Sequence, residues 1–161
     1  MYRIGEGFDL HRLEAGRKLR IGCVDVPAPV GSVAHSDGDV LAHAIVDALL
    51  GAIGEGDIGR HFPPADPKWK GADSRVFLAE AARRIAARGG RIANVDSTVI
   101  LESPKLAPHI ASMCAELARA LGCEPSAVSV KAKSAEGVGA VGEGTAVEAR
   151  AVVLVWLPDA S

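Results

Sequence analysis

This sequence has few aromatic residues, no long apolar run and no excess of basic residues. Aromatic side chains make up 4% of its 161 residues, so the core must be built from smaller side chains that each bury modest area. No run approaches the 18 apolar residues of a transmembrane helix, which argues against a membrane span. The formal net charge is −2, whereas nucleic-acid-binding proteins usually carry a basic surface. We therefore expect a globular protein without a membrane or nucleic-acid partner.

Cysteine is also scarce. Cys23, Cys114 and Cys123 show no CxxC spacing, which favours reduced cysteines in a cytoplasmic protein. The N-terminal residues show no basic segment followed by an apolar stretch, so no secretory signal is visible. The expected location is the cytoplasm.

The length favours one domain over residues 1–161. Apolar periodicity and glycine and proline positions predict strands at 2–11, 18–26, 91–101, 128–133 and 146–157, and helices at 37–55, 73–88 and 108–121. A loop rich in proline and glycine is expected at 57–72 and a glycine-rich loop at 134–144. This order favours an α+β fold, a two-layer sandwich of a mixed β-sheet with helices on one face.

Three residues form a candidate metal site. Asp9 and His11 are two apart on the first predicted strand, so their side chains share a face. His43 lies in the first predicted helix. Two imidazoles and a carboxylate are the ligands of many open zinc sites. Alone, the D-x-H pair is a weak signal, because a single histidine is more often structural.

The helix adds a polar stripe with two interpretations. Asp39, His43 and Asp47 follow an i, i+4, i+8 spacing. They could form a solvated face. Alternatively, His43 is a ligand whose second ring nitrogen is held by one of the two carboxylates.

The segment before this helix is a candidate anion site. Ser36 or Asp37 would cap the helix well. The N–H groups of a helix start also attract anions, and His35 and Ser36 would add donors. A plain cap and a phosphate site both remain open at this point.

Six motifs, taken together, resemble the 2-C-methyl-D-erythritol 2,4-cyclodiphosphate synthase family. In order they are GFDLH (7–11), AHSDGDVLAHAIVDALLGA (34–52), GDIGRHFPPADPKWKGADSR (56–75), NVDSTVI (94–100), SPKLAPHI (103–110) and VKAKSAEG (130–137). The resemblance spans nearly the whole chain.

The resemblance implies an enzyme, a phosphorus–oxygen lyase of non-mevalonate isoprenoid synthesis. Its substrate would be 4-diphosphocytidyl-2-C-methyl-D-erythritol 2-phosphate, whose 2-phosphate attacks the β-phosphorus and expels CMP. It implies zinc on Asp9, His11 and His43, and Mg²⁺ or Mn²⁺ on Glu136. These four are the implied catalytic residues.

The resemblance also implies the substrate contacts and the assembly. The phosphate contacts match His35 and Ser36, and the turn and loop at the erythritol match Asp57, Ile58, Gly59 and Asp66. The cytidine contacts match Pro104, Lys105 and Leu106. The nucleotide diphosphate contacts match Lys133 and Ser134. The family forms homotrimers with active sites between subunits.

Two departures from the family pattern stand out. Pro64 replaces one acid of the substrate loop, and the loop at 136–144 matches Glu143 but offers no arginine near the threefold axis. We therefore expect weak binding of isoprenoid diphosphates on that axis. Two rival functions use the same residues: a zinc-dependent phosphoester hydrolase, and a non-catalytic trimeric metal- or ligand-binding protein.

Overall fold

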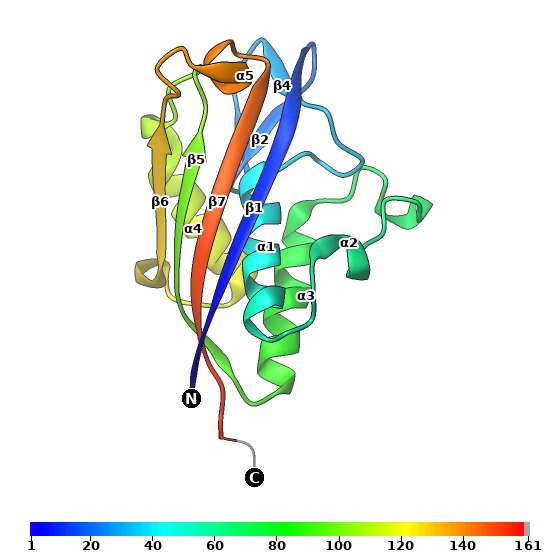
Figure 1. Ribbon diagram of the computed structural model, residues 1–161, viewed down its shortest axis with the longest axis vertical. Helices are drawn as coiled ribbons and strands as arrows, with labels where there is room; N and C mark the ends of the chain where they lie inside the picture. Colours follow the sequence, from blue (N-terminus) through cyan, green and yellow to red (C-terminus); the bar gives the residue numbers. More distant parts are fainter. Residues whose placement is uncertain (160–161) are drawn as a thin grey trace.

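A five-stranded sheet dominates the computed structural model, which describes residues 1–159 (Figure 1). Its strands run in the order β4-β1-β7-β5-β6 and are β1 (Tyr2–Ala15), β4 (Val30–Ser32), β5 (Arg91–Ile100), β6 (Val128–Lys133) and β7 (Ala146–Trp156). β5 and β6 are parallel, and the other neighbours are antiparallel. The sheet is mixed, as the sequence predicts.

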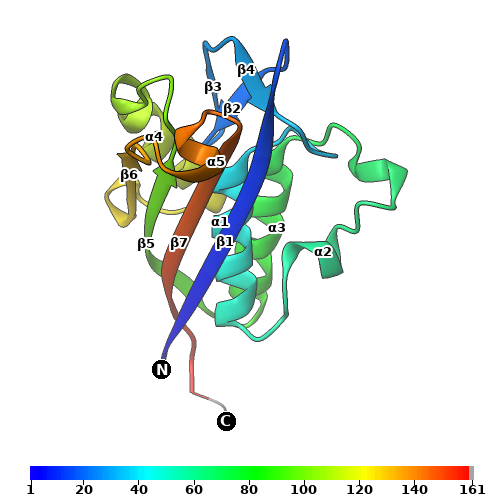
Figure 2. The same cartoon turned by 45° about the horizontal axis from the view of Figure 1, so that its top comes forward.

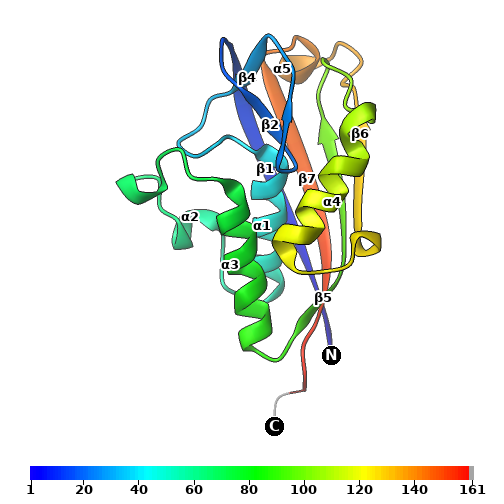
Figure 3. The ribbon, with the colours of Figure 1, turned by 180° about the vertical axis from the view of Figure 1, so that it is seen from behind.

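Three helices cover one face of the sheet, as Figures 1 and 3 show from opposite sides. They are α1 (Val40–Ala52), α3 (Ser74–Ala87) and α4 (Ile110–Leu121). α1 lies between the sheet and α3, so 11 of its 13 residues are buried. The α+β class and the helix-on-sheet layering predicted from the sequence are confirmed. Among residues 1–159, no helix is long and apolar enough to cross a membrane.

Two glycines let β1 lie directly on α1. A Cβ atom added at Gly5 would be 1.8 Å from the carbonyl oxygen of Ala48, and one added at Gly7 would be 2.0 Å from that of Ala44. Only glycine permits such a backbone approach. The approach brings the next residues of β1 beside the first turns of α1.

The strand predicted at 18–26 is wrong and is instead a hairpin. β2 (Leu19–Ile21) and β3 (Val24–Val26) pair antiparallel outside the main sheet. Gly22 and Cys23, with φ of 60° and 63°, make the two-residue turn. Two residues with positive φ match the twist that a tight hairpin needs. The sequence does not reveal this turn, because cysteine is an uncommon residue at such a position.

Both predicted loops contain short helices. α2 (Ile58–His61) and the 3₁₀ turn η1 (Pro67–Trp69) lie within 57–72, and α5 (Gly139–Gly142) lies within 134–144, over one end of β7 (Figure 2). Two further 3₁₀ turns, η2 (Ala107–His109) and η3 (Pro125–Ala127), precede α4 and β6. α1 begins at Val40 rather than at residue 37, because Asp39 is its N-cap instead of Ser36 or Asp37.

An ion-pair network joins the end of α1 to α3. Glu55 follows α1, and its two carboxylate oxygens lie 2.7 Å from Arg84 Nη1 and 2.8 Å from Arg88 Nη2. Arg88 also donates to the carbonyl oxygen of Ile53 at 2.6 Å. The hydrogen bond from Arg84 lowers the pKa of Glu55. The network therefore fixes the turn that leads into α2.

Glu55→Gln is expected to lower the free energy of unfolding at pH 7 by about 1 kcal/mol, the upper range for such networks. The folded pKa of Glu55 lies below its unfolded value. The ionic stabilisation is thus present above the unfolded pKa of about 4.3 and is lost as the pH falls through the folded pKa. Urea unfolding at pH 7 and pH 3 measures both effects. Glu14→Gln, which breaks the half-exposed pair with Arg17, is the control; an equal loss there would contradict a special role for the network.

Candidate active site

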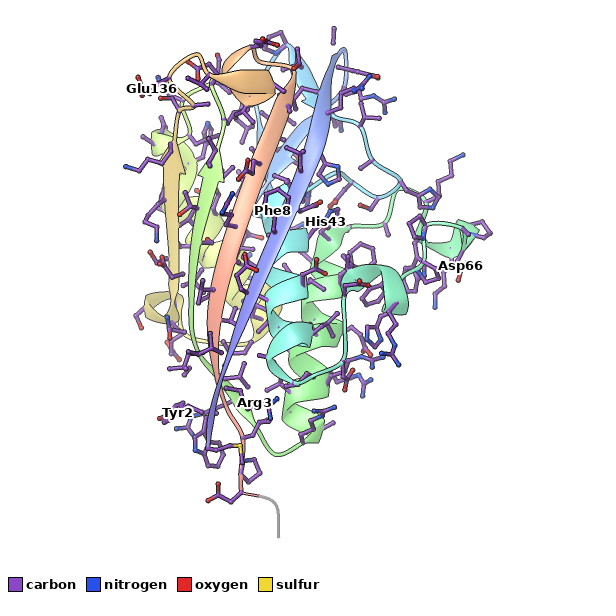
Figure 4. The ribbon with its side chains drawn as sticks, in the orientation of Figure 1. Tyr2, Arg3, Phe8, His43, Asp66 and Glu136 are labelled. Carbon is purple, nitrogen blue, oxygen red and sulfur yellow. The ribbon has the colours of Figure 1, made fainter. Side chains whose placement is uncertain are left out.

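Asp9, His11 and His43 come together on the helix-facing side of β1. His11 Nε2 and His43 Nδ1 lie 2.8 Å and 3.0 Å from Asp9 Oδ2, and 3.2 Å from each other. The potential ligand atoms all lie within 4.8 Å of one another, so these residues could hold a metal ion. Figure 4 shows His43 behind β1, on α1. The alternation of β1 and the tight packing of α1 on it produce this convergence.

The backbone orients His11. Its Nδ1 lies 3.3 Å from the carbonyl oxygen of Val33, to which it donates, so its Nε2 faces the other two residues. Burial lowers the pKa of His11, but the hydrogen bond and the charge of Asp9, together with the hydrogen bond to Val33, outweigh this and raise it. Burial raises the pKa of Asp9, yet its interactions with the adjacent imidazoles of His11 and His43 hold that pKa well below its usual range. The carboxylate is thereby kept in the form that binds cations.

The second ring nitrogen of His43 contacts two serines, so the carboxylate partner predicted from the helical stripe is wrong. His43 Nε2 lies 3.1 Å from the Oγ atoms of both Ser36 and Ser74. Asp39 instead accepts hydrogen bonds from the N–H groups of Gly22, Cys23 and Ala42, and Asp47 accepts from that of Ile58. Buried N–H groups need acceptors, and these short side chains provide them.

The solvated-face interpretation of the stripe is wrong as well. Asp39 is fully buried, and His43 is only 8% exposed. Burial raises the pKa of Asp39, and the hydrogen bonds that it accepts from backbone N–H groups offset part of this rise. Asp39 is therefore a structural link between α1 and the β2–β3 hairpin.

A cavity of about 220 Å³ opens onto the three candidate ligands. Four of the predicted substrate residues line it, namely His35, Ser36, Ile58 and Gly59. Pro64, the departure in the substrate loop, lines it too. Asp57 caps α2 beside the cavity, and Asp66 caps η1 on the outside of the loop, away from His43 in Figure 4.

Sequence reasoning missed the apolar wall of this cavity. Phe62 lies 4.6 Å from Phe77 and 5.1 Å from Trp69, measured between ring centroids. Phe77 also lies 6.1 Å from His43. These are three of only six aromatic residues in the chain, so their scarcity was the signal that could have marked them. The wall attaches the 62–70 loop to α3.

A second cavity of about 130 Å³ gathers the other predicted contacts. Pro104, Lys105, Leu106, Lys133 and Ser134 line it. Ser134 Oγ donates a hydrogen bond to Glu136, whose backbone adopts a φ of 52°. Within residues 1–159, the two cavities share no lining residue.

The two groups lie on different parts of the sheet. β7 and β5 separate β1, which bears Asp9 and His11, from β6, which leads to Glu136. Three strand spacings amount to about 14 Å. Figure 4 accordingly shows Glu136 and His43 far apart. One chain thus holds the two groups of predicted residues apart.

Residues 2–156 match the YgbB family. The chain is 53% identical to the 2-C-methyl-D-erythritol 2,4-cyclodiphosphate synthase of Dechloromonas aromatica over 154 residues, 96% of each protein. It is 59% identical over 154 residues to the bifunctional enzyme IspD/IspF of Albidiferax ferrireducens, covering 96% of this chain but 37% of that enzyme.

The fold of this chain also matches solved structures. One is a 2C-methyl-D-erythritol-2,4-cyclodiphosphate synthase in its CDP-bound form, with a TM-score of 0.88 and 44% identity over 96% of this chain and all of the other.

Proposed function

Because this chain belongs to the YgbB family and its activity is the synthesis of 2-C-methyl-D-erythritol 2,4-cyclodiphosphate in the non-mevalonate pathway, we propose that a zinc ion on Asp9, His11 and His43 assists the reaction. The reaction closes the cyclic diphosphate of the product from 4-diphosphocytidyl-2-C-methyl-D-erythritol 2-phosphate and releases CMP. The observation that carries the zinc proposal is the convergence of the three ligand atoms in one cavity with Ser36.

The donor set fits zinc. Two imidazole nitrogens and a carboxylate oxygen, with open space beside them, are the ligands of open zinc sites. When bound there, zinc would supply a Lewis acid that neutralises phosphate charge. Asp9 sets the charge of the site, and Val33 orients His11.

The residues around the ligands would bind and orient the reacting phosphates. We propose that His35 and Ser36 donate hydrogen bonds to a phosphate. Asp57, Ile58 and Gly59, with Asp66 on the same loop, would hold the erythritol hydroxyls. The attacking phosphate oxygen is already anionic near neutral pH. The protein therefore has to position it against the β-phosphorus, and needs no nucleophile of its own.

The second cavity is the proposed nucleotide half-site. Pro104, Lys105 and Leu106 would enclose the cytidine, while Lys133 and Ser134 would contact its diphosphate. The CDP-bound relative supports a cytidine nucleotide as the ligand. Glu136 would hold Mg²⁺ or Mn²⁺, which prefer oxygen ligands and when bound would neutralise the diphosphate.

A homotrimer would join the half-sites. The substrate carries both a cytidine and an erythritol phosphate, so the half-site at His43 needs a nucleotide half-site from another copy. The sheet face opposite the helices supports this assembly, because Ile4, Phe8 and Leu10 are 73%, 45% and 52% exposed there. An apolar surface of this kind is typical of subunit interfaces. We propose one catalytic domain over residues 1–161, located in the cytoplasm.

The expectation about isoprenoid diphosphates stays a prediction. That expectation rests on the loop that contains Glu143, an exposed residue at the end of α5. On the open sheet face, however, Arg150 lies 5.4 Å over the ring of Phe8 and pairs with Glu148. If this face surrounds the trimer axis, Arg150 supplies the positive charge that the loop lacks, which weakens the reason for the expectation.

Incubating the purified protein with the cytidylylated substrate tests the function. We expect equimolar CMP and cyclic diphosphate, identified by chromatography and ³¹P NMR, and loss of both after chelation of metal. A linear phosphate product would favour the hydrolase, and tight binding without turnover would favour the binding protein.

Glu136→Gln tests the second metal. The variant is expected to keep its zinc but to need at least roughly tenfold more Mg²⁺ for half-maximal CMP release, the lower end of the effect of outer-shell changes at metal sites. An amide oxygen is a poorer ligand for a hard cation. Glu143→Gln, an exposed glutamate of the same loop, is the control. Superimposable Mg²⁺ titrations of the two variants would show that Glu136 does not bind the second metal.

A further inference from the structure

The nitrogen of His43 that points away from Asp9 lies between two serine hydroxyls with different surroundings. Ser36 lines the cavity, where it is available to a ligand. Ser74, in the first turn of α3, is fully buried. Both Oγ atoms are 3.1 Å from His43 Nε2. Only Ser74 is therefore a permanent partner of this nitrogen.

The Ser74 hydroxyl donates its hydrogen bond to Asp37. Ser74 Oγ donates to Asp37 Oδ1, while the backbone N–H of Ser74 donates to Asp37 Oδ2 at 2.8 Å. Arg20 Nε lies 3.2 Å from the same Oδ2. An ionised carboxylate accepts hydrogen bonds and donates none. Because its hydrogen is committed, Ser74 Oγ can only accept from His43 Nε2.

We propose that Asp37 and Ser74 are positioning residues that hold the hydrogen of His43 on Nε2 and leave Nδ1 bare toward Asp9 and His11. A neutral imidazole carries one hydrogen, and a metal binds the nitrogen without it. His43 Nδ1 is the atom that lies 3.0 Å from Asp9 Oδ2. The importance of the pair for zinc binding rests on the proposed zinc site. The arrangement also releases Ser36 to bind phosphate.

Asp37→Asn reverses the direction of these hydrogen bonds at nearly constant size. The backbone N–H of Ser74 donates to the Oδ2 position at 2.8 Å and Arg20 Nε lies 3.2 Å from it, whereas the N–H of Asp39 reaches the Oδ1 position only at 3.3 Å. The amide oxygen therefore takes the Oδ2 position. The amide NH₂ then faces Ser74 Oγ and donates to it. Ser74 must in turn donate to His43 Nε2, which moves the imidazole hydrogen to Nδ1. Zinc affinity is expected to fall about 10- to 100-fold.

The first measurement is ¹⁵N NMR of the metal-free protein labelled at histidine. We expect His43 to carry its hydrogen on Nε2 in the unmodified protein and on Nδ1 in Asp37→Asn. The second measurement is zinc affinity by competition with a chromogenic chelator. The NMR result needs no zinc, so a hydrogen on Nδ1 in the unmodified protein would overturn the inference. The expected tautomer without measurable zinc affinity would support the hydrogen-bond inference and contradict the zinc site.

Two matched controls separate positioning from folding. Ser97→Ala removes another buried serine hydroxyl, which donates to the carbonyl oxygen of Ser129 at 2.9 Å, and Asp25→Asn removes another carboxylate partner of Arg20. Both should keep the tautomer and zinc affinity of the unmodified protein. Ser74→Ala, which removes the acceptor, should populate both tautomers and weaken zinc binding. Retention of the Nε2 hydrogen in Asp37→Asn, or an equal loss of affinity in the controls, would overturn the proposal.

Discussion

His43→Ala is expected to lower zinc affinity and CMP release by more than about 100-fold, because changes in outer-shell partners alone cost 10- to 100-fold. The variant removes one of the three proposed ligands and leaves Asp9 and His11 on the same strand. Two ligands cannot close a tetrahedral site. His43 is 8% exposed, and the residues on either side of it in α1 are buried apolar residues. No other side chain of α1 can therefore take its place.

The measurements are zinc content by atomic emission and CMP release by chromatography. His109→Ala, which changes a histidine outside both cavities, is the control and should keep its zinc and its turnover. Stoichiometric zinc with near-normal turnover in His43→Ala would show that the ligand assignment is wrong. Retained zinc with lost turnover would instead make His43 a substrate contact.

The candidate ligands could be predicted because their geometry is local. Asp9 and His11 share a face by strand alternation, and His43 lies in a helix with a strong apolar period. The partners of His43 Nε2 were not predictable in this way. Ser74 is 31 residues away from His43, and only the packing of α3 on α1 brings the two together. Polar spacing in the helix suggested that Asp39 or Asp47 holds this nitrogen. Both carboxylates instead accept hydrogen bonds from backbone N–H groups.

The layering of the sheet and helices followed from periodicity, whereas the hairpin and the two half-sites did not. The turn at Gly22 and Cys23 lies between two short strands and lacks a typical turn sequence. The distance between His43 and Glu136 depends on strand order, which no local pattern encodes. Strand order is also the reason that the proposed site would take its two halves from two copies of the chain.

Gly7→Ala is expected to destabilise the protein by about 3 kcal/mol or more, the upper range for overpacking. The added Cβ would lie 2.0 Å from the carbonyl oxygen of Ala44 and 2.7 Å from the amide nitrogen of Ala48. Both atoms belong to the backbone of α1, so no side-chain rotation can relieve the contact. β1 and α1 must move apart. The movement would separate Asp9, two residues along β1, from His43, and zinc affinity should fall with stability.

Gly51→Ala is the matched control for this prediction, because it changes a glycine of α1 where a Cβ has room. The nearest atom to a Cβ at Gly51 is the carbonyl oxygen of Glu6 at 3.9 Å, an ordinary contact. Replacing a helical glycine by alanine should stabilise the protein by about 0.5–1 kcal/mol, the opposite sign. Urea unfolding gives both values, and chelator competition gives zinc affinity. An unchanged unfolding midpoint in Gly7→Ala would mean that α1 can shift without cost, and that the close approach of β1 does not hold His43 beside Asp9.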